Sequence, residues 1–327
     1  MLAGLTGRSI FRRDPGRASG SHPTTGRRAI GRVARREQRA AYLFLSPWII
    51  GMVLFVIGPV VVSIVLSLTN YSIIFPSHWI GLQNYDTMLH DSIFWQSLAI
   101  TLTFVVYSVP LYLIVGLGLS LLLNMKRRGV NLFRTVIFLP YVISGVAVAI
   151  LWSSLLNPQF GGVNWLLRHV GIANPPLWLQ SPTWALPSVV LIGLWSVGGG
   201  AIIYLAGLQN IPAQLYEAAE VDGAGPWQRF RYVTFPMLTP TLLFVLLTGL
   251  VSAFQVFDVV YLLGGPMGGT GSALNFYLLN LWTQGFGNGR LGYASGLAWI
   301  LVLMSGIVIV AVFKGASRWV YYEHEGN

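Results

Sequence analysis

The chain has 327 residues, of which 54% are apolar and only 9% are charged, far below the roughly 25% usual in soluble domains. So few charges cannot cover a soluble core of this length, and the composition predicts an integral membrane protein. The absence of cysteine excludes disulfides, thiolate chemistry and cysteine-based metal sites. The five histidines show no metal-ligand spacing, so no metal site is expected.

Residues 1–40 are expected to form an Arg-rich, disordered cytoplasmic tail. They contain ten arginines, only Asp14 and Glu37 as acids, and many Gly, Ser and Pro residues. Such a segment cannot bury enough apolar surface to offset the entropy lost on ordering. The net charge of +10 allows a nucleic-acid-binding arm. An anchor beside anionic lipid is favoured instead, because an apolar run follows directly.

Six apolar runs follow, each long enough to form a helix across a hydrocarbon core, which needs about 20 residues. Residues 41–322 are therefore expected to form an all-α, polytopic membrane domain with six transmembrane helices. A β-barrel would instead show alternating segments of about ten residues. The six runs are Ala41–Leu68, Phe94–Leu123, Leu132–Leu155, Trp184–Ala206, Thr241–Leu263 and Leu291–Phe313.

The placement of Lys and Arg predicts the orientation of these spans. Eighteen of the twenty basic residues fall in the two terminal segments, in or just after the turn at 124–131, and in the loop at 207–240, while the other loops hold only Arg168 and Arg290. Loops rich in Lys and Arg remain in the cytoplasm. Both termini and the 207–240 loop are therefore expected on the cytoplasmic side.

The fourth run contains three successive glycines, Gly198–Gly200, in the sequence WSVGGG. Glycine weakens a helix locally and lets a neighbouring helix approach closely. The pattern is compatible with a hinge or broken helix beside a solute path, and with tight packing, which is the commoner reason for it.

The 207–240 loop carries the start and stop signals of helices. Pro212 suits the first turn of a helix that Gly223 would end, and Pro226 suits the start of a second short helix. Pro236 and Pro240 are expected to prevent this second helix from continuing. The loop is either a helical linker at the membrane surface or a docking element for a soluble partner.

The fifth run contains Asp258, the one clear ionisable residue away from the ends of the runs. A carboxylate at the bilayer centre costs about 2.5–3.5 kcal/mol, so it should face protein or water. In a continuous helix Gln255 and Tyr261 would share its face, which predicts a substrate pathway lined by these three side chains. The alternative is that Asp258 lies near the outer interface and only organises packing.

Several catalytic signatures are absent from the sequence. There is no GxxxxGK[ST] loop, so ATP hydrolysis is not expected in this chain. There is also no nucleophile elbow, HExxH motif or paired intramembrane carboxylate. The chain is therefore expected to have no catalytic residues and no cofactor of its own.

The long loop resembles the signature of permease subunits of bacterial binding-protein-dependent ABC importers: EAA, three residues, Gly, nine residues, then an Ile-x-Leu-Pro-like end. Here it reads Glu217-Ala218-Ala219, Gly223, and Val-Thr-Phe-Pro ending at Pro236. The segments GLQNYDTML, RTVIFLPYVIS and FQVFDVVYLLGGP are similar to the carbohydrate-uptake branch of that family, the last to the first permease subunit of maltose transporters. The resemblance covers roughly residues 41–320.

This resemblance implies a type I ABC importer permease in the bacterial cytoplasmic membrane that imports a sugar or related polyol. It implies a second homologous permease, two ATP-binding subunits that hold ATP and Mg, and an extracytoplasmic solute-binding protein as partners. The loop would form a coupling helix seated in a cleft of an ATP-binding subunit. The coupling residues it implies are Glu217, Ala218, Ala219, Asp222, Gly223 and Pro236.

Two other functions fit a membrane protein of this composition. One is a stand-alone transporter coupled to a proton or sodium gradient, a class that usually shows internal repeats and several intramembrane charges. This sequence offers a single intramembrane Asp and no visible repeat. The other is a membrane scaffold, which would leave the loop signature without a purpose.

Overall fold

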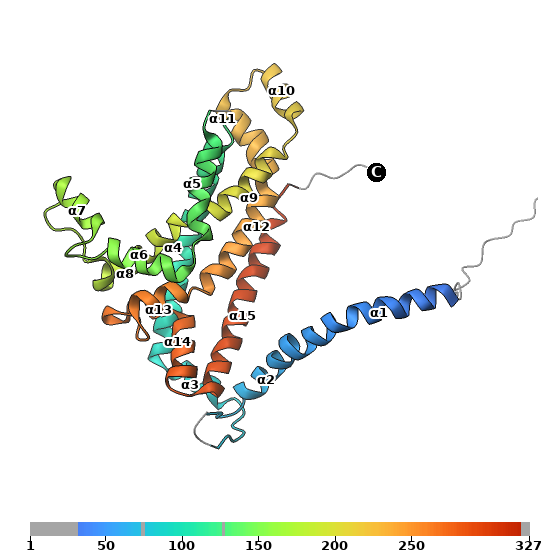
Figure 1. The fold of residues 1–327 in the computed structure, drawn as a ribbon, viewed down its shortest axis with the longest axis vertical. Coiled ribbons are helices and arrows are strands. Elements are labelled where there is room, and N and C mark those ends of the chain that lie inside the picture. Colours follow the sequence, from blue (N-terminus) through green and yellow to red (C-terminus); the bar gives the residue numbers. More distant parts are fainter. Residues whose placement is uncertain (1–31, 73–75, 126–127, 322–327) are drawn as a thin grey trace, which may run out of the picture. The chain divides into compact units, whose positions relative to one another are not determined.

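The computed structural model describes residues 32–72, 76–125 and 128–321. Within these ranges helices dominate, and the extended structure is limited to an isolated bridge between Thr69 and Trp79. The residues up to Gly58 and those from Pro59 onward form two separate units (Figure 1). The expectation of an all-α protein is confirmed for the described residues.

The first unit contains α1 and the π-helical turn η1. The boundary follows Gly58, the first residue of α2, so the rest of α2 and all later elements belong to the second unit. The helical elements are α1 (Arg32–Met52), η1 (Val53–Ile57), α2 (Gly58–Ser67), α3 (Gln83–His90), α4 (Ser92–Leu123), α5 (Val130–Val142), α6 (Gly145–Leu155), α7 (Gly162–His169), η2 (Trp178–Gln180), α8 (Pro182–Trp195), α9 (Gly198–Gln209), α10 (Ala213–Val221), α11 (Pro226–Arg229), η3 (Phe230–Thr234), α12 (Phe235–Phe254), α13 (Asp258–Gly264), η4 (Thr270–Ser272), α14 (Tyr277–Trp282), η5 (Thr283–Gly287) and α15 (Leu291–Ala316).

The predicted tail is partly helical. Because α1 begins at Arg32, the expectation of disorder up to residue 40 is wrong for residues 32–40. Arg, Glu, Gln and Ala are good helix formers, and this segment continues without a break into the apolar run that follows. Residues 1–31, which hold the rest of the predicted tail, lie outside the described residues.

In the part of the chain that the structure describes, four helical segments are long and apolar enough to cross a membrane: Glu37–Ser67, Ser92–Leu123, Pro226–Gly264 and Leu291–Ala316. Two further pairs meet the same criterion only together, because each pair is bent at a short break. The bend is 99° between α5 and α6 and 45° between α8 and α9. The six apolar runs therefore all form helices, but the third and fourth are each bent at a break and the fifth is interrupted after Phe254, an interruption that the sequence did not suggest.

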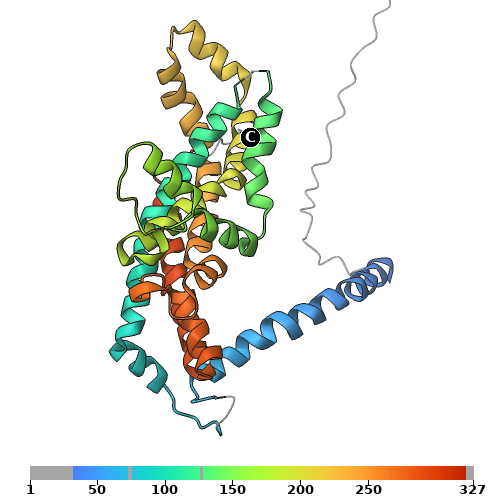
Figure 2. The same cartoon turned by 60° about the vertical axis from the view of Figure 1, so that its left-hand side comes forward.

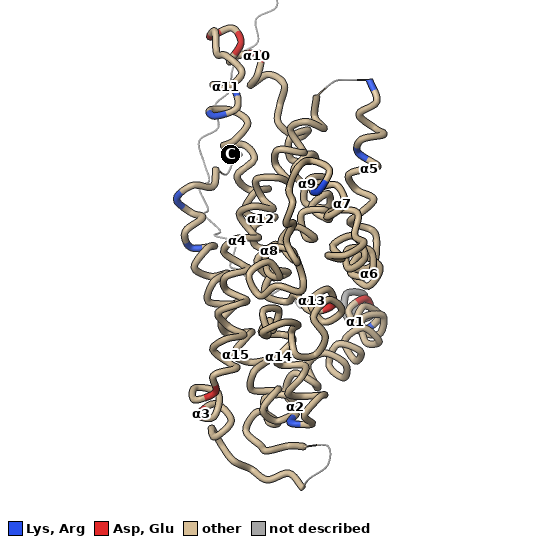
Figure 3. Tube along the Cα trace, turned by 90° about the vertical axis from the view of Figure 1, so that its left-hand side faces the viewer, with Lys and Arg blue, Asp and Glu red and all other residues tan. Residues whose placement is uncertain are grey.

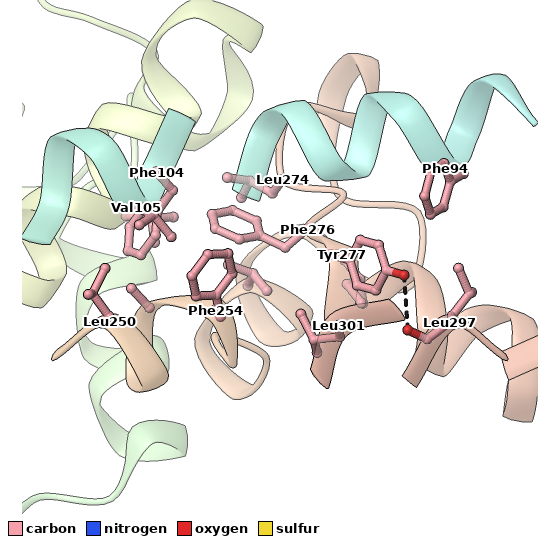
Figure 4. Close-up of a cluster of buried hydrophobic side chains, with 14 of the residues drawn as sticks. Phe94, Phe104, Val105, Leu250, Phe254, Leu274, Phe276, Tyr277, Leu297 and Leu301 are labelled. Atoms are coloured by element: carbon pink, nitrogen blue, oxygen red, sulfur yellow. Dashed lines mark hydrogen bonds between the residues drawn. The ribbon is translucent and has the colours of Figure 1, made fainter. Parts of the chain in front are cut away.

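The core of the second unit joins segments that are far apart in the sequence. Phe104 of α4 packs edge-on against Phe276, with ring centroids 5.1 Å apart. Tyr277, the first residue of α14, donates its backbone N–H to Thr101 Oγ1 at 2.8 Å and its hydroxyl to the Leu297 carbonyl at 2.9 Å (Figure 4). These contacts hold the short helix α14 between α4 and α15.

The second unit carries α10 and α11 at one end and α3 at the other (Figures 1 and 2). The described end of the chain lies at the α10 end, because Tyr321 donates its backbone N–H to Thr239 Oγ1 at 2.9 Å. Figure 3 shows Lys and Arg gathered at this same end, around α11 and the start of α5. The 207–240 loop with Arg229 and Arg231, the turn after α4 and the end of α15 thus share one end of the bundle.

Candidate functional site

The loop at 207–240 folds into two short helices whose ends follow the sequence signals. Pro212 immediately precedes α10. At the other end Gly223 adopts a left-handed conformation with φ of 75°, and its N–H donates to the Glu220 carbonyl at 3.0 Å. The N–H of Ala224 donates to the Ala219 carbonyl at 2.9 Å. This pair of bonds is a Schellman motif, which requires glycine or a tolerant residue at position 223.

The second helix continues further than expected. It starts at Pro226, where Gln228 Oε1 accepts the Gly225 N–H at 2.7 Å, and runs through η3 directly into α12. The expectation that Pro236 and Pro240 stop it is wrong. The wider π-helical turn shifts the hydrogen-bond register before Pro236, and Thr239 Oγ1 donates to the Pro236 carbonyl at 2.6 Å.

Three kinds of contact fix α10 to the membrane helices. The hydroxyl of Tyr216 bonds to Thr234 Oγ1 at 3.0 Å, and Glu220 pairs with Arg229 at 3.5 Å. At the base of α10 Ile211 is buried in an apolar cluster with residues of α9 and α12. The helix is therefore attached to both α9 and α12, although the mostly exposed ion pair contributes little to this attachment.

The outer face of α10 is fully available to a partner. None of its residues is buried, and the apolar Val221 at its end is 89% exposed, as is 72% of Trp227 on the following helix α11. Large apolar side chains exposed beside charged ones are typical of a protein–protein contact surface. The predicted coupling residues lie on this helix and its terminus: Glu217, Ala218, Asp222 and Gly223 are exposed and Ala219 is half-buried.

Pro236, the sixth predicted coupling residue, lies elsewhere. It is half-buried near the start of α12 and lines a pocket with Leu215, Tyr232 and Tyr321. The structure therefore brings five of the six predicted residues together and places Pro236 at the base of the loop rather than on its exposed face.

A chamber lies deeper in the bundle, where helices are interrupted. Two cavities, of about 290 Å³ and about 380 Å³, share lining residues and so adjoin. Ile143 and Gly145 line it from the α5/α6 break, Ser196 and Val197 from the α8/α9 break, and Val256 from the break after α12. Irregular backbone at membrane depth is tolerated where it lines a cavity, and transporters bind solutes at such discontinuous helices.

The polar groups of this chamber were not anticipated. They are the side chains of Tyr112, Tyr141, Ser196, Thr248 and Ser252. Tyr112 is fixed because its hydroxyl donates to the Val190 carbonyl at 3.0 Å. The sequence signal for them was a hydroxyl within an apolar run, which is common in packed membrane helices and therefore weak.

The three glycines Gly198–Gly200 lie at a break in the helix and also allow tight helix packing. The bend of 45° lies at residues 196–197, immediately before Gly198. A Cβ on Gly198 would overlap the Ile137 carbonyl oxygen and lie 2.9 Å from its carbon, and one on Gly199 would lie 2.5 Å from the Tyr141 ring. The glycines thus permit both the break and the close approach of α5 to α9.

The predicted line of Gln255, Asp258 and Tyr261 is not formed as expected. The helix stops at Phe254, Gln255 has φ of −107°, and Asp258 begins the separate helix α13. The inference that Gln255 shares a helical face with Asp258 is therefore wrong, because it assumed an unbroken helix. Tyr261 instead packs against Trp282, with ring centroids 4.7 Å apart.

Asp258 lies at the edge of the chamber. Its side chain is exposed and has no ion pair among the residues that the structure describes. A Cβ built on Gly145, which lines the chamber, would lie 3.7 Å from the Asp258 Cβ. From the same segment Val256 and Val259 line the chamber itself. Asp258 is thus close to the chamber, and a role in solute passage stays a proposal.

Residues 113–320 match the family described as the binding-protein-dependent transport system inner membrane component. This chain belongs to that family. The permease is 41% identical to the probable ABC transporter permease protein YesP of Bacillus subtilis, over 89% of its own length and 95% of that protein. It is 35% identical to the trehalose/maltose transport system permease protein MalF of Thermococcus litoralis. That similarity covers 85% of this chain and 94% of that protein.

A solved structure gives the same fold for the permease. It is a bacterial alginate ABC transporter in complex with an alginate pentasaccharide-bound periplasmic protein. One of its chains matches the permease with a TM-score of 0.76 and 25% sequence identity. The match covers 85% of the permease and 93% of that chain. The family and the fold confirm the resemblance to ABC importer permeases. The permease is thus an inner membrane transport component and not itself an enzyme.

Proposed function

We propose that this permease is one of two membrane subunits of an ATP-driven importer of a sugar or related polyol. In this proposal α10 is the element gripped by a separate ATP-binding subunit. The observation that carries it is a short helix that bears the signature residues, buries none of its own side chains and is nevertheless fixed at its base. A mobile loop could not transmit a rigid-body movement, whereas an anchored helix can.

The contacts of α10 suggest how the movement reaches the chamber. Tyr216 and Glu220 tie α10 to η3 and α11, which continue into α12, and Ile211 ties its base to α9. The break before α9 and the break after α12 both border the chamber. A displacement of α10 would therefore shift two helices whose interrupted ends line the same cavity. This coupling would open or close the chamber without unfolding a helix.

The chemistry of the chamber fits a neutral, hydroxylated solute. Its described lining carries no charged side chain, and its polar side chains are the hydroxyl-bearing Tyr112, Tyr141, Ser196, Thr248 and Ser252. An anionic solute would require a cation nearby. The named relative transports trehalose and maltose, and the related structure holds an oligosaccharide on its periplasmic protein, which supports the carbohydrate class. Gln255, Asp258 and Tyr261 are proposed to border the route beside this chamber.

The remaining subunits follow from this proposal. A solute-binding protein would deliver the sugar on the outer side, a second homologous permease would complete the passage, and two ATP-binding subunits would hold ATP and Mg. The permease would lie in the cytoplasmic membrane with α10 and both termini in the cytoplasm, where the basic residues would face anionic lipid. No nucleic acid is required as a partner.

Two substitutions test the coupling role of α10. Gly223→Asp strains a left-handed position, and Glu217→Lys reverses an exposed charge; both are expected to abolish uptake while the protein remains in the membrane. The matched controls are Gly171→Asp, at another left-handed glycine with open space around it, and Asp86→Lys, at an exposed acid on α3. Radiolabelled sugar uptake and sugar-stimulated ATPase activity of the purified complex are the measurements.

Normal uptake and normal ATPase coupling in both α10 variants would reject the proposal. A stand-alone, ion-driven carrier would show uptake in vesicles with an ion gradient and no ATP. Family membership does not favour that alternative.

Single cysteines test the proposed orientation, because the natural chain contains none. Val221→Cys on α10 should be protected from a membrane-impermeant thiol reagent in intact cells and labelled in inverted vesicles. Val170→Cys, at the end of α7, should show the opposite pattern, since both side chains are well exposed. The reversed result would place α10 outside the cell and exclude an ATPase partner.

A further inference from the structure

A basic pocket lies apart from the coupling helix and the chamber. It forms where the turn after α4 meets the start of α5 and the end of α9, and its volume is about 570 Å³. Its polar lining consists of Asn124, Arg128, Asn131, Arg134 and Gln209. No acidic side chain contributes to the described lining, so the pocket has a positive potential.

The two arginines of this pocket are not neutralised within the protein. Neither Arg128 nor Arg134 has a carboxylate partner among the described residues. Arg134 donates one bond, from Nη2 to the Leu123 carbonyl at 3.2 Å, while its buried Nε has no partner. A guanidinium presents its donors in a planar fork that matches phosphate oxygens. Donors of both arginines therefore remain available to an anion.

The start of α5 adds a second, independent attraction for an anion. This helix has 13 residues, and Gly129 at its N-cap, with φ of 87°, offers no side chain to cap it. Val130 and Asn131, its first two residues, both line the pocket. The first N–H groups of a helix lack intrahelical partners and carry partial positive charge, which makes such a terminus a binding site for phosphate.

We propose that this pocket binds the phosphate headgroup of an anionic phospholipid. Leu132 and Phe133, directly beside the pocket on α5, are 69% and 61% exposed and offer an apolar surface for the acyl chains. The headgroup would bridge the end of α4 and the start of α5. This role is independent of the coupling helix and of the transported solute.

Lipid retention by the purified full complex tests the proposal. The complex is reconstituted in nanodiscs of phosphatidylcholine with phosphatidylglycerol, and the lipids that remain bound after delipidation are counted by native mass spectrometry. Wild type should retain phosphatidylglycerol in preference to phosphatidylcholine. The Arg128→Gln/Arg134→Gln variant should lower that preference about tenfold or more, because charge-assisted bonds are lost. The Lys314→Gln/Arg318→Gln variant removes the same charge at the same end and should retain the preference.

Two further variants separate binding from folding. Arg128→Gln alone changes an exposed side chain and should lower retention without affecting stability. Arg134→Lys keeps the charge but loses the planar fork, and should lower retention partially. Equal retention by wild type and the Arg128→Gln/Arg134→Gln variant would overturn the proposal. So would an equal loss in the Lys314→Gln/Arg318→Gln control, since that result would indicate general charge attraction only.

A second measurement distinguishes the source of the phosphate. Inorganic phosphate is titrated into the lipid-depleted complex in detergent, and the unfolding temperature is followed. A lipid site should respond to added phosphatidylglycerol and only weakly to inorganic phosphate. Full stabilisation by inorganic phosphate, lost in the arginine variant, would replace the lipid by a soluble phosphate and overturn the proposal.

Discussion

The three glycines after the α8/α9 break predict a graded response to alanine. At Gly198 the added Cβ would overlap backbone atoms of Ile137, with the carbonyl carbon at 2.9 Å, and backbone cannot rotate aside. At Gly199 it would meet the Tyr141 ring, which is 58% exposed and can move. At Gly200 the nearest atom, Val245 Cγ1, is 3.6 Å away, an ordinary contact.

These distances set the expected magnitudes. Non-bonded carbons prefer about 3.5–4.0 Å, and the Ile137 carbonyl oxygen lies nearer still than its carbon, so Gly198→Ala must push α5 and α9 apart by roughly an ångström or more. Overpacking of this kind costs about 1–3 kcal/mol. Gly200→Ala makes no clash within α9 and removes a poor helix former, which stabilises the protein by about 0.5–1 kcal/mol. The two variants should therefore differ by roughly 1.5–4 kcal/mol, with Gly199→Ala between them.

Unfolding of the purified permease in mixed micelles with increasing SDS measures this order, and the chain's 12 tryptophans provide the signal. Gly198→Ala should unfold first and Gly200→Ala last. Uptake should follow the same order, because the bend at residues 196–197 borders the chamber. Equal stability of the Gly198→Ala and Gly200→Ala variants would refute the close approach of α5 to α9.

Two further predictions concern the chamber and the coupling helix. In the cysteine-free chain, Ser252→Cys and Asp258→Cys should react with a small polar thiol reagent, whereas Val260→Cys, at a fully buried position, should not. Uniform protection of the first two would remove both from the solute route. Tyr216→Phe should weaken the attachment of α10 to η3 by about 0.5–1.5 kcal/mol and lower sugar-stimulated ATPase activity, while Thr234→Val should add nothing further in the double variant. Full additivity of the two losses would show that this hydrogen bond does not hold α10.

Local signals in the sequence predicted the elements of the coupling loop well. Pro212, Gly223 and Pro226 mark the helix ends because each residue has a backbone preference that neighbours cannot alter. The same reliance on backbone preference gave the wrong expectation that Pro236 and Pro240 end the second helix. Their effect on a helix depends on whether the chain can widen into a π-helical turn and whether a nearby hydroxyl can bond the carbonyl, and both conditions are met here.

The chamber could not be predicted from the sequence, because hydrophobic periodicity does not show where a helix is interrupted. Apolar runs predict that a helix exists, but FQVF at 254–257 contains no Gly or Pro to signal the break there. The face assigned to Gln255 and Asp258 followed from assuming an unbroken helix, so one missed break invalidated it. The α8/α9 break, in contrast, carried its own signal in three glycines. The meeting of three breaks in one cavity arises from tertiary packing.

The uninterrupted helix α12 has a geometric consequence for gating. It contains 20 residues from Phe235 to Phe254, so it is about 30 Å long. A rod of that length, tilted by about 10° about its loop end, carries its far tip sideways by about 5 Å, close to the rise of one helical turn. Small rotations imposed at the loop end of α12 are thereby magnified at its far tip, where the unwound residues 255–257 can act as the joint that absorbs them.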